Sequence, residues 1–262
     1  MRKFLICMLG VVSGIVLLTS GNAFAAVVTL DLTSDNSGSI NGAQFWSIYP
    51  KGTGTGVIDA FVEIGANTDV IRAYNTIVDG VLDNTNTDQF NHELLLSSVP
   101  IVTLEDGINY REFLLDINQQ GNHPYLTVDE IQVFRSSTAN QSKETFTGGI
   151  VDITGGLVYQ MDAGGNSTIL LDFNHGSGSG DMFTYIPDSL FSSKTGDYVY
   201  LYSQLGGDSF KGVAYPNNDG HEEWAVQKGA TTNPPVPEPA TMSLLGLGLL
   251  GLVGFRRKKA SN

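Results

Sequence analysis

Cysteine is nearly absent from this chain of 262 residues. The only one is Cys7, which lies in an N-terminal apolar segment that we expect to be removed from the mature protein. A protein without cysteine has no disulfide, no zinc site built on thiolates and no cysteine nucleophile.

Basic residues are also scarce. Residues 26–236 contain eight of the 14 Lys and Arg residues but 26 of the 27 Asp and Glu residues, which gives this region a net charge of −18. A surface of this sign repels phosphate backbones, so we expect no nucleic-acid partner. The same charge attracts cations and is compatible with binding of Ca²⁺.

Catalytic motifs are missing as well. The chain has neither an H-E-x-x-H nor a G-x-S-x-G motif, and its four histidines are widely separated. Adjacent acidic pairs occur at 105–106, 129–130 and 222–223. Such a pair does not by itself form a glycosidase site, because neighbouring side chains of a strand point to opposite faces. We therefore expect no enzymatic activity.

The N-terminus has the three parts of a secretory signal peptide. Arg2 and Lys3 precede an apolar run, and a small-x-small cleavage site follows at Ala23-Phe24-Ala25. We expect residues 1–25 to be a signal peptide that is cleaved after Ala25. Export by this route places the following domain outside the cytoplasm.

The C-terminus combines a proline-rich spacer with an apolar segment. Prolines in residues 229–236 prevent pairing into a sheet and predict an extended linker. In the tail 237–262, residues 240–255 carry no charge and predict a transmembrane helix. The helix is followed by a basic end, made of Arg256, Arg257, Lys258 and Lys259. We expect this basic end to stay in the cytoplasm, so that the tail anchors the exported domain in the membrane.

This tail resembles the sorting domain of PEP-CTERM proteins. The resemblance is carried by Val236-Pro237-Glu238-Pro239-Ala240-Thr241, the Gly- and Leu-rich apolar segment and the terminal basic cluster. In that family an exosortase, a membrane-embedded cysteine peptidase, recognises and cleaves the tail in Gram-negative bacteria that make exopolysaccharide. The resemblance implies that Pro237, Glu238 and Pro239 are the recognition tripeptide, and that the mature protein leaves the inner membrane for the cell surface or matrix. An ordinary single-span anchor is the alternative.

Residues 26–228 predict a single all-β domain. About twelve short β-rich runs alternate with Gly, Asn, Asp and Pro, which is typical of a jelly-roll-like β-sandwich. The only helical signal is a turn near residues 187–192. The apolar alternation along 126–134 shifts at Asp129-Glu130, which predicts a β-bulge there. Residues 136–149 are small and polar and predict a long exposed loop.

A calcium site is compatible with one glycine-rich segment of this domain. Asp172, Asn174 and Asp181 offer oxygen ligands around it, although the segment is not an EF-hand, since its sixth position is Ser177 and its twelfth is Phe183. Residues 31–36 are a second candidate. For both segments the alternative is a turn rich in Gly, Asn and Asp.

A row of tyrosines offers a second kind of site. Tyr198, Tyr200 and Tyr202 alternate with apolar residues and therefore share one face of a strand. If the row is exposed, its rings suit stacking on sugars; if the row is covered, the rings belong to the core.

Together these features predict an exported surface or extracellular-matrix protein that is processed by an exosortase and associated with exopolysaccharide or biofilm. A carbohydrate-binding module, dependent on Ca²⁺ or not, is the first alternative, and a secreted polysaccharide hydrolase is the second. An exposed, ring-lined groove would favour the binding module, and a deep cleft with two facing carboxylates would favour the hydrolase. A closed sandwich with neither would favour the non-enzymatic surface protein.

Overall fold

The computed structural model describes residues 27–48, 58–85, 89–173 and 180–228. The predicted signal peptide with Ala23 and Ala25, the linker, the sorting tail and Asn174 lie outside these residues. In the described part the chain forms β-strands with very little helix, which confirms the all-β prediction.

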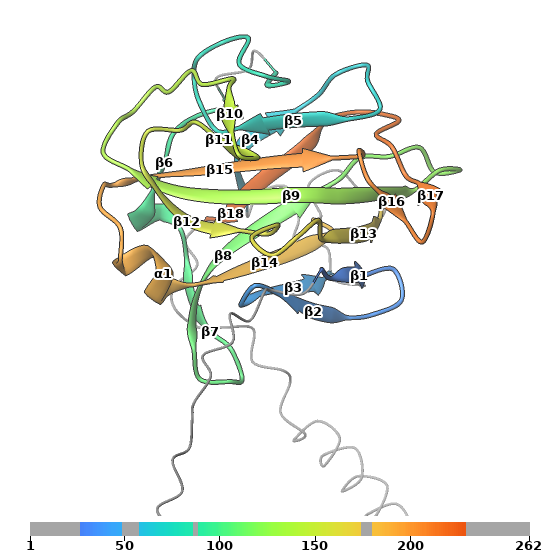
Figure 1. Ribbon diagram of the computed structural model, residues 1–262, viewed down its shortest axis with the longest axis horizontal. Coiled ribbons are helices and arrows are strands. Elements are labelled where there is room, and N and C mark those ends of the chain that lie inside the picture. Colours follow the sequence, from blue (N-terminus) through green and yellow to red (C-terminus); the bar gives the residue numbers. More distant parts are fainter. Residues whose placement is uncertain (1–26, 49–57, 86–88, 174–179, 229–262) are drawn as a thin grey trace, which may run out of the picture.

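The strands form two seven-stranded sheets that stack as layers (Figure 1). The sheet around β9, called here the β9 sheet, runs in the order β1 (Thr29–Asp31), β13 (Thr168–Asp172), β9 (Tyr125–Ser136), β15 (Tyr198–Leu205) and β5 (Ile71–Tyr74), with β12 (Gly156–Gln160) beside β9 and β6 (Leu94–Leu95) beside β15. The β8 sheet runs in the order β2 (Ser37–Ile40), β3 (Ala43–Ser47), β14 (Met182–Pro187), β8 (Asn109–Asp116), β18 (Glu222–Gln227) and β4 (Ile58–Ile64), with β7 (Ile101–Thr103) beside β8. Two small hairpins, β10 (Phe146–Thr147) with β11 (Ile150–Val151) and β16 (Ser209–Phe210) with β17 (Val213–Ala214), lie outside these sheets.

The main hydrophobic core lies between the two layers. Alternate residues of each strand face it, such as Leu126 and Val128 on β9 and Phe113 and Leu115 on β8, and all of them are buried. Trp224 on β18 is fully buried there, and its indole N–H donates a hydrogen bond of 2.9 Å to the hydroxyl of Ser203 on β15. This bond joins the two sheets through the middle of the core.

The register of β9 against β15 contains the predicted bulge. Glu130 pairs with Gln204, whereas the next residue of β15, Leu205, pairs with Val128, so that Asp129 is the extra residue. The bulge at Asp129-Glu130 is therefore confirmed. It keeps Val128 and Ile131 together on the core face, although two residues lie between them in sequence.

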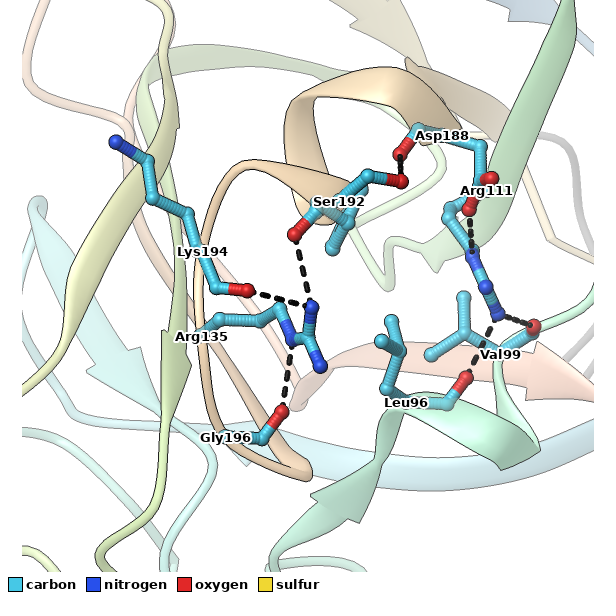
Figure 2. Close-up of polar contacts among 9 residues, drawn as sticks. Leu96, Val99, Arg111, Arg135, Asp188, Ser192, Lys194 and Gly196 are labelled. Atoms are coloured by element: carbon cyan, nitrogen blue, oxygen red, sulfur yellow. Dashed lines mark hydrogen bonds and ion pairs between the residues drawn. The ribbon is translucent and has the colours of Figure 1, made fainter.

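One end of the sandwich is closed by the short helix α1 (Asp188–Ser192), where the sequence predicted a helical turn. Arg135 of the β9 sheet donates a hydrogen bond to the carbonyl oxygen of Phe191 in this helix. It also donates to the carbonyl oxygens of Lys194 and Gly196, which follow the helix (Figure 2). Arg111 of the β8 sheet donates to Asp188 and to two carbonyl oxygens of the 3₁₀ turn η1 (Leu96–Ser98), that of its first residue Leu96 and that of Val99, which follows it (Figure 2). Two of the few cations of this acidic domain therefore serve the fold.

Candidate functional site

The tyrosine row lies on the outer face of the β9 sheet and is largely covered. Tyr200 and Tyr202 are at most 2 % exposed, and Tyr198 is half-buried. The ring of Tyr202 packs edge-on against Phe146 of the β10–β11 hairpin at 5.5 Å, and Tyr200 packs against Tyr74 at 6.1 Å. The burial of Tyr200 and Tyr202 favours the core alternative for these two rings.

Two of the three residues of the predicted calcium site lie around a hollow of about 510 Å³. Asp172 and Asp181 line it together with residues 33–36, so the structure brings the two candidate segments to one place. One carboxylate oxygen of Asp181 accepts a hydrogen bond of 2.7 Å from the backbone N–H of Ile117. Among the described residues, no three His, Cys, Asp or Glu side chains form a group that could hold a metal ion. Since Asn174 lies outside the described residues, calcium at this loop stays a prediction.

A second hollow, of about 390 Å³, lies on the outer face of the β9 sheet and was not predicted. We call it the acid–amide hollow. Its lining contains carboxyl, amide, guanidinium and aromatic groups: Arg72, Asp129, Glu130, Phe146, Gly148, Gly149, Gln160, Asp162, Gly165, Asn166, Tyr202 and Gln204. Asp129 and Glu130 both line it, although adjacent residues of a regular strand would point to opposite faces. The bulge at Asp129 changes this alternation, so both side chains reach the same hollow.

The carboxyl groups of this hollow are held by backbone donors. Asp129 accepts hydrogen bonds from the N–H groups of Gly207 at 2.5 Å and Asp208 at 3.0 Å. Glu130 accepts from the N–H groups of Ile131 at 3.0 Å and Met161 at 3.1 Å. These bonds fasten the turn after β15 and the end of β12 to the bulge.

Burial raises the pKa values of these carboxyls toward the neutral range. Loss of solvent raises the pKa of Asp129 to about 7, against the effect of its backbone hydrogen bonds. Burial and the nearby charge of Asp162 raise the pKa of Glu130 to about 7, and burial raises the pKa of Asp162 itself to about 6. The acid–amide hollow is therefore lined by three carboxyls that titrate near neutral pH.

The β10–β11 hairpin forms one wall of the acid–amide hollow. Its two turn residues, Gly148 and Gly149, have φ angles of 61° and 83°, which glycine adopts without strain. Gln132 of β9 holds the hairpin on the sheet, since its amide donates to the carbonyl of Gly149 at 2.7 Å and accepts from the N–H of Val151 at 3.0 Å. At the rim, the guanidinium of Arg72 lies 5.2 Å from the centre of the Phe146 ring. The wall is thus built from a glycine turn, which the sequence predicted as part of a polar loop, and from the buried amide of Gln132, which lies in a strand.

Three acids also lie side by side on the β8 sheet. Glu223 of β18 pairs with Glu63 of β4 on one side and with Asp116 of β8 on the other. Burial and these two neighbours raise the pKa of Glu223 to about 7. Like charges directly opposite one another destabilise a sheet, and protonation of Glu223 relieves that repulsion.

No helix in the described part of the chain is both long and apolar enough to cross a membrane. The predicted transmembrane segment 240–255 lies outside that part.

The comparisons with known proteins concern the C-terminal region. No curated protein and no solved structure matches the chain. Residues 235–258 match the family model of the PEP-CTERM protein-sorting motif. This range includes Pro237, Glu238 and Pro239, the apolar segment and the first three residues of the basic end. The chain therefore carries a PEP-CTERM sorting motif after its β-rich domain, as the sequence predicted.

Proposed function

We propose that this chain is an exported protein that an exosortase releases from the inner membrane to the cell surface or extracellular matrix of a Gram-negative bacterium, where it associates with exopolysaccharide without enzymatic activity. The observation that carries the proposal is the PEP-CTERM sorting motif at 235–258. The predicted signal peptide at 1–25 supports the same route, because export has to precede sorting at the outer side of the membrane.

We further infer that the exported domain is a jelly roll. Such a fold arises when a long antiparallel hairpin of eight strands rolls up into two sheets, so that the first strand pairs with the eighth, the second with the seventh and so on. Four antiparallel pairs support this order: β4 with β18, β5 with β15, β8 with β14 and β9 with β13. A rolled sandwich of this kind is a stable surface module that needs neither disulfide nor metal to close its core.

The non-enzymatic role is supported by the bonding of the acids that share a hollow. A hydrolase of sugars needs one carboxyl as an acid and a second as a base or nucleophile, both open to the substrate. Asp129 and Glu130 instead direct oxygens to backbone N–H groups of two turns. Their arrangement suits fastening of the structure better than proton transfer to a substrate.

Exosortase processing has a direct test in the mass of the mature protein. Material from a host that contains an exosortase is expected to begin at Ala26 and to lack the apolar segment after Pro239. The same gene in a host without the exosortase is expected to yield a protein that keeps the basic end, residues 256–259. Intact-mass spectrometry distinguishes the two. Mature protein that keeps these basic residues in the presence of the exosortase contradicts the proposal.

A carbohydrate-binding module is the second candidate, and the acid–amide hollow favours it. The amides of Gln160, Gln204 and Asn166 offer donors and acceptors beside the carboxyl groups. Such a mixture matches the hydroxyl groups of a sugar, which also donate and accept hydrogen bonds. In this second function the domain would hold the polysaccharide directly rather than reside beside it.

Binding at this hollow is tested by glycan arrays that carry neutral, acidic and amino-sugar oligomers. If the second candidate holds, the purified chain is expected to bind at least one class, and Gln160→Ala and Gln204→Ala are each expected to weaken binding about tenfold, which corresponds to the loss of one or two hydrogen bonds. Gln227→Ala, which removes a half-buried amide from the β8 sheet, is the matched control. Absence of binding, or equal loss in the control, removes the second candidate and leaves the first untouched.

A further inference from the structure

A third hollow, of about 380 Å³, lies between two loops that are about 150 residues apart in sequence. We call it the loop hollow. It is lined by residues 66–69, which follow β4, and by residues 216–220, which precede β18. The two loops meet because the end of β4 pairs with the start of β18, with Ile64 opposite Glu222. A backbone hydrogen bond of 2.9 Å from the N–H of Asn217 to the carbonyl of Asp69 joins them.

The lining of the loop hollow is rich in oxygen and contains no basic side chain. Two exposed carboxylates come from Asp69 and Asp219, and further side-chain oxygens come from Asn67, Thr68 and Asn218. Carboxylate, amide and backbone carbonyl oxygens are the ligands that hard divalent cations prefer. The strongly negative domain raises the local concentration of such cations.

Asn217 supplies an independent sign of a ligand. It is only 8 % exposed, and its side-chain N–H₂ donates to the carbonyl oxygens of Ala66 and Thr68, both at 3.1 Å. These two residues also line the loop hollow, so the amide of Asn217 lies at its wall. Its side-chain oxygen Oδ1 is buried and has no hydrogen-bond partner among the described residues. Because an unpaired buried acceptor is costly, such an atom calls for a partner that the protein itself does not provide.

We propose that the loop hollow binds Ca²⁺, with the carboxylates of Asp69 and Asp219 and the Oδ1 atom of Asn217 as ligands. Two carboxylates balance the charge of a divalent cation, and Ca²⁺ accepts irregular sets of six to eight oxygens, including water. Mg²⁺ requires a near-ideal octahedron and loses its water reluctantly, so the irregular loops favour Ca²⁺. The site is distinct from the predicted loop at 172–181. Its effect is to tie the connection after β4 to the segment before β18, at one end of the β8 sheet.

The test is a set of thermal melts of the full purified chain, first in chelator and then with Ca²⁺ or Mg²⁺ at about 10 mM. Extracellular calcium modules have dissociation constants of about 10⁻⁴ to 10⁻³ M. At about a hundred times the dissociation constant, Ca²⁺ is expected to raise the melting temperature by about 5–10 °C, and Mg²⁺ is expected to raise it much less. Asp69→Asn and Asp219→Asn should each weaken the Ca²⁺ response strongly, measured also as heat of binding by calorimetry.

Two further variants make the result specific. Glu105→Gln removes an exposed carboxylate from the turn after β7 and is expected to keep the full response. Asp172→Asn, at the other predicted loop, is also expected to keep it. Since Asp69 and Asp219 are exposed, their variants should melt near the parent temperature in chelator. The proposal is overturned by a parent chain that does not respond to Ca²⁺, by an equal response to Mg²⁺, or by a response that Asp172→Asn abolishes while Asp69→Asn and Asp219→Asn preserve it.

Discussion

Lowering the pH from 8 to 5 is expected to stabilise the folded domain. Glu112, Asp129 and Glu130 are buried, and the loss of solvent raises the pKa of each to about 7 in the folded protein. In the unfolded chain the same carboxyls have their ordinary pKa values near 4. Between these two limits the folded state binds more protons than the unfolded state, so the free energy of unfolding increases as the pH falls through 7.

The expected size of this effect is large. A carboxyl whose pKa moves from 4.5 to about 7 on folding destabilises the folded state at pH 8 by on the order of 3 kcal/mol. Several such groups act together, including Glu222, whose pKa burial raises well above the usual range. We therefore expect the free energy of unfolding to be several kcal/mol higher at pH 5 than at pH 8, measured by urea denaturation at constant ionic strength.

One variant separates the buried groups from the general negative charge of the domain. Self-repulsion of that charge also weakens as the pH falls. Glu112 is buried, and one of its side-chain oxygens has no hydrogen-bond partner in the described structure. Glu112→Gln keeps the shape of this side chain but removes the group that titrates. The free energy of unfolding should then depend less steeply on pH between 5 and 7. The difference in slope should correspond to the uptake of up to one proton on folding. The exposed variant Glu105→Gln should leave the slope almost unchanged. A free energy of unfolding that increases as the pH rises from 5 to 8 would contradict the raised pKa values assigned to these buried carboxyls.

Replacement of Trp224 by alanine is expected to destabilise the domain by about 3–5 kcal/mol. The indole is fully buried between the sheets, so its removal forfeits a large apolar contact and leaves a cavity. It also removes the hydrogen bond from the indole N–H to Ser203. The free energy of unfolding from urea denaturation at pH 6 measures the loss.

Two further variants accompany this test: one isolates the hydrogen bond, and the other is a control on the surface. Ser203→Ala keeps the indole but leaves its N–H without an acceptor in the core, at an expected cost of about 1–3 kcal/mol. Val213→Ala, at a side chain that is 52 % exposed, should change stability by less than about 0.5 kcal/mol. A loss below about 1 kcal/mol for Trp224→Ala would mean that the core does not depend on this side chain.

The sequence by itself determined the features that depend on neighbours along the chain. Alternation of apolar residues defined the all-β class, and the break in that alternation located the bulge at Asp129. The tripeptide Pro237-Glu238-Pro239, followed by an apolar segment and a basic end, was sufficient for the sorting motif, because such a motif is recognised as a linear segment.

Only the tertiary structure decided which faces and loops meet. Alternation placed Tyr200 and Tyr202 on one side of a strand, but it contained no information about what covers that side. Tyr200 packs against Tyr74 of β5, and Tyr202 is covered by Phe146, in a segment that the sequence predicted to be an exposed loop. A two-residue turn of glycines and the amide of Gln132 fold this segment onto the sheet, and both act through contacts with distant residues.

The tertiary structure also decided which side chains line the loop hollow. Asp69 and Asp219 are about 150 residues apart, and nothing in their local sequence distinguishes them from the other solvated acids of the domain. They share a hollow because β4 and β18 pair in the β8 sheet. Strand pairing between segments far apart in the chain is set by burial of the whole core, a sum over many residues. Local sequence therefore specified the strands, whereas the joint burial of those strands decided which polar side chains came together.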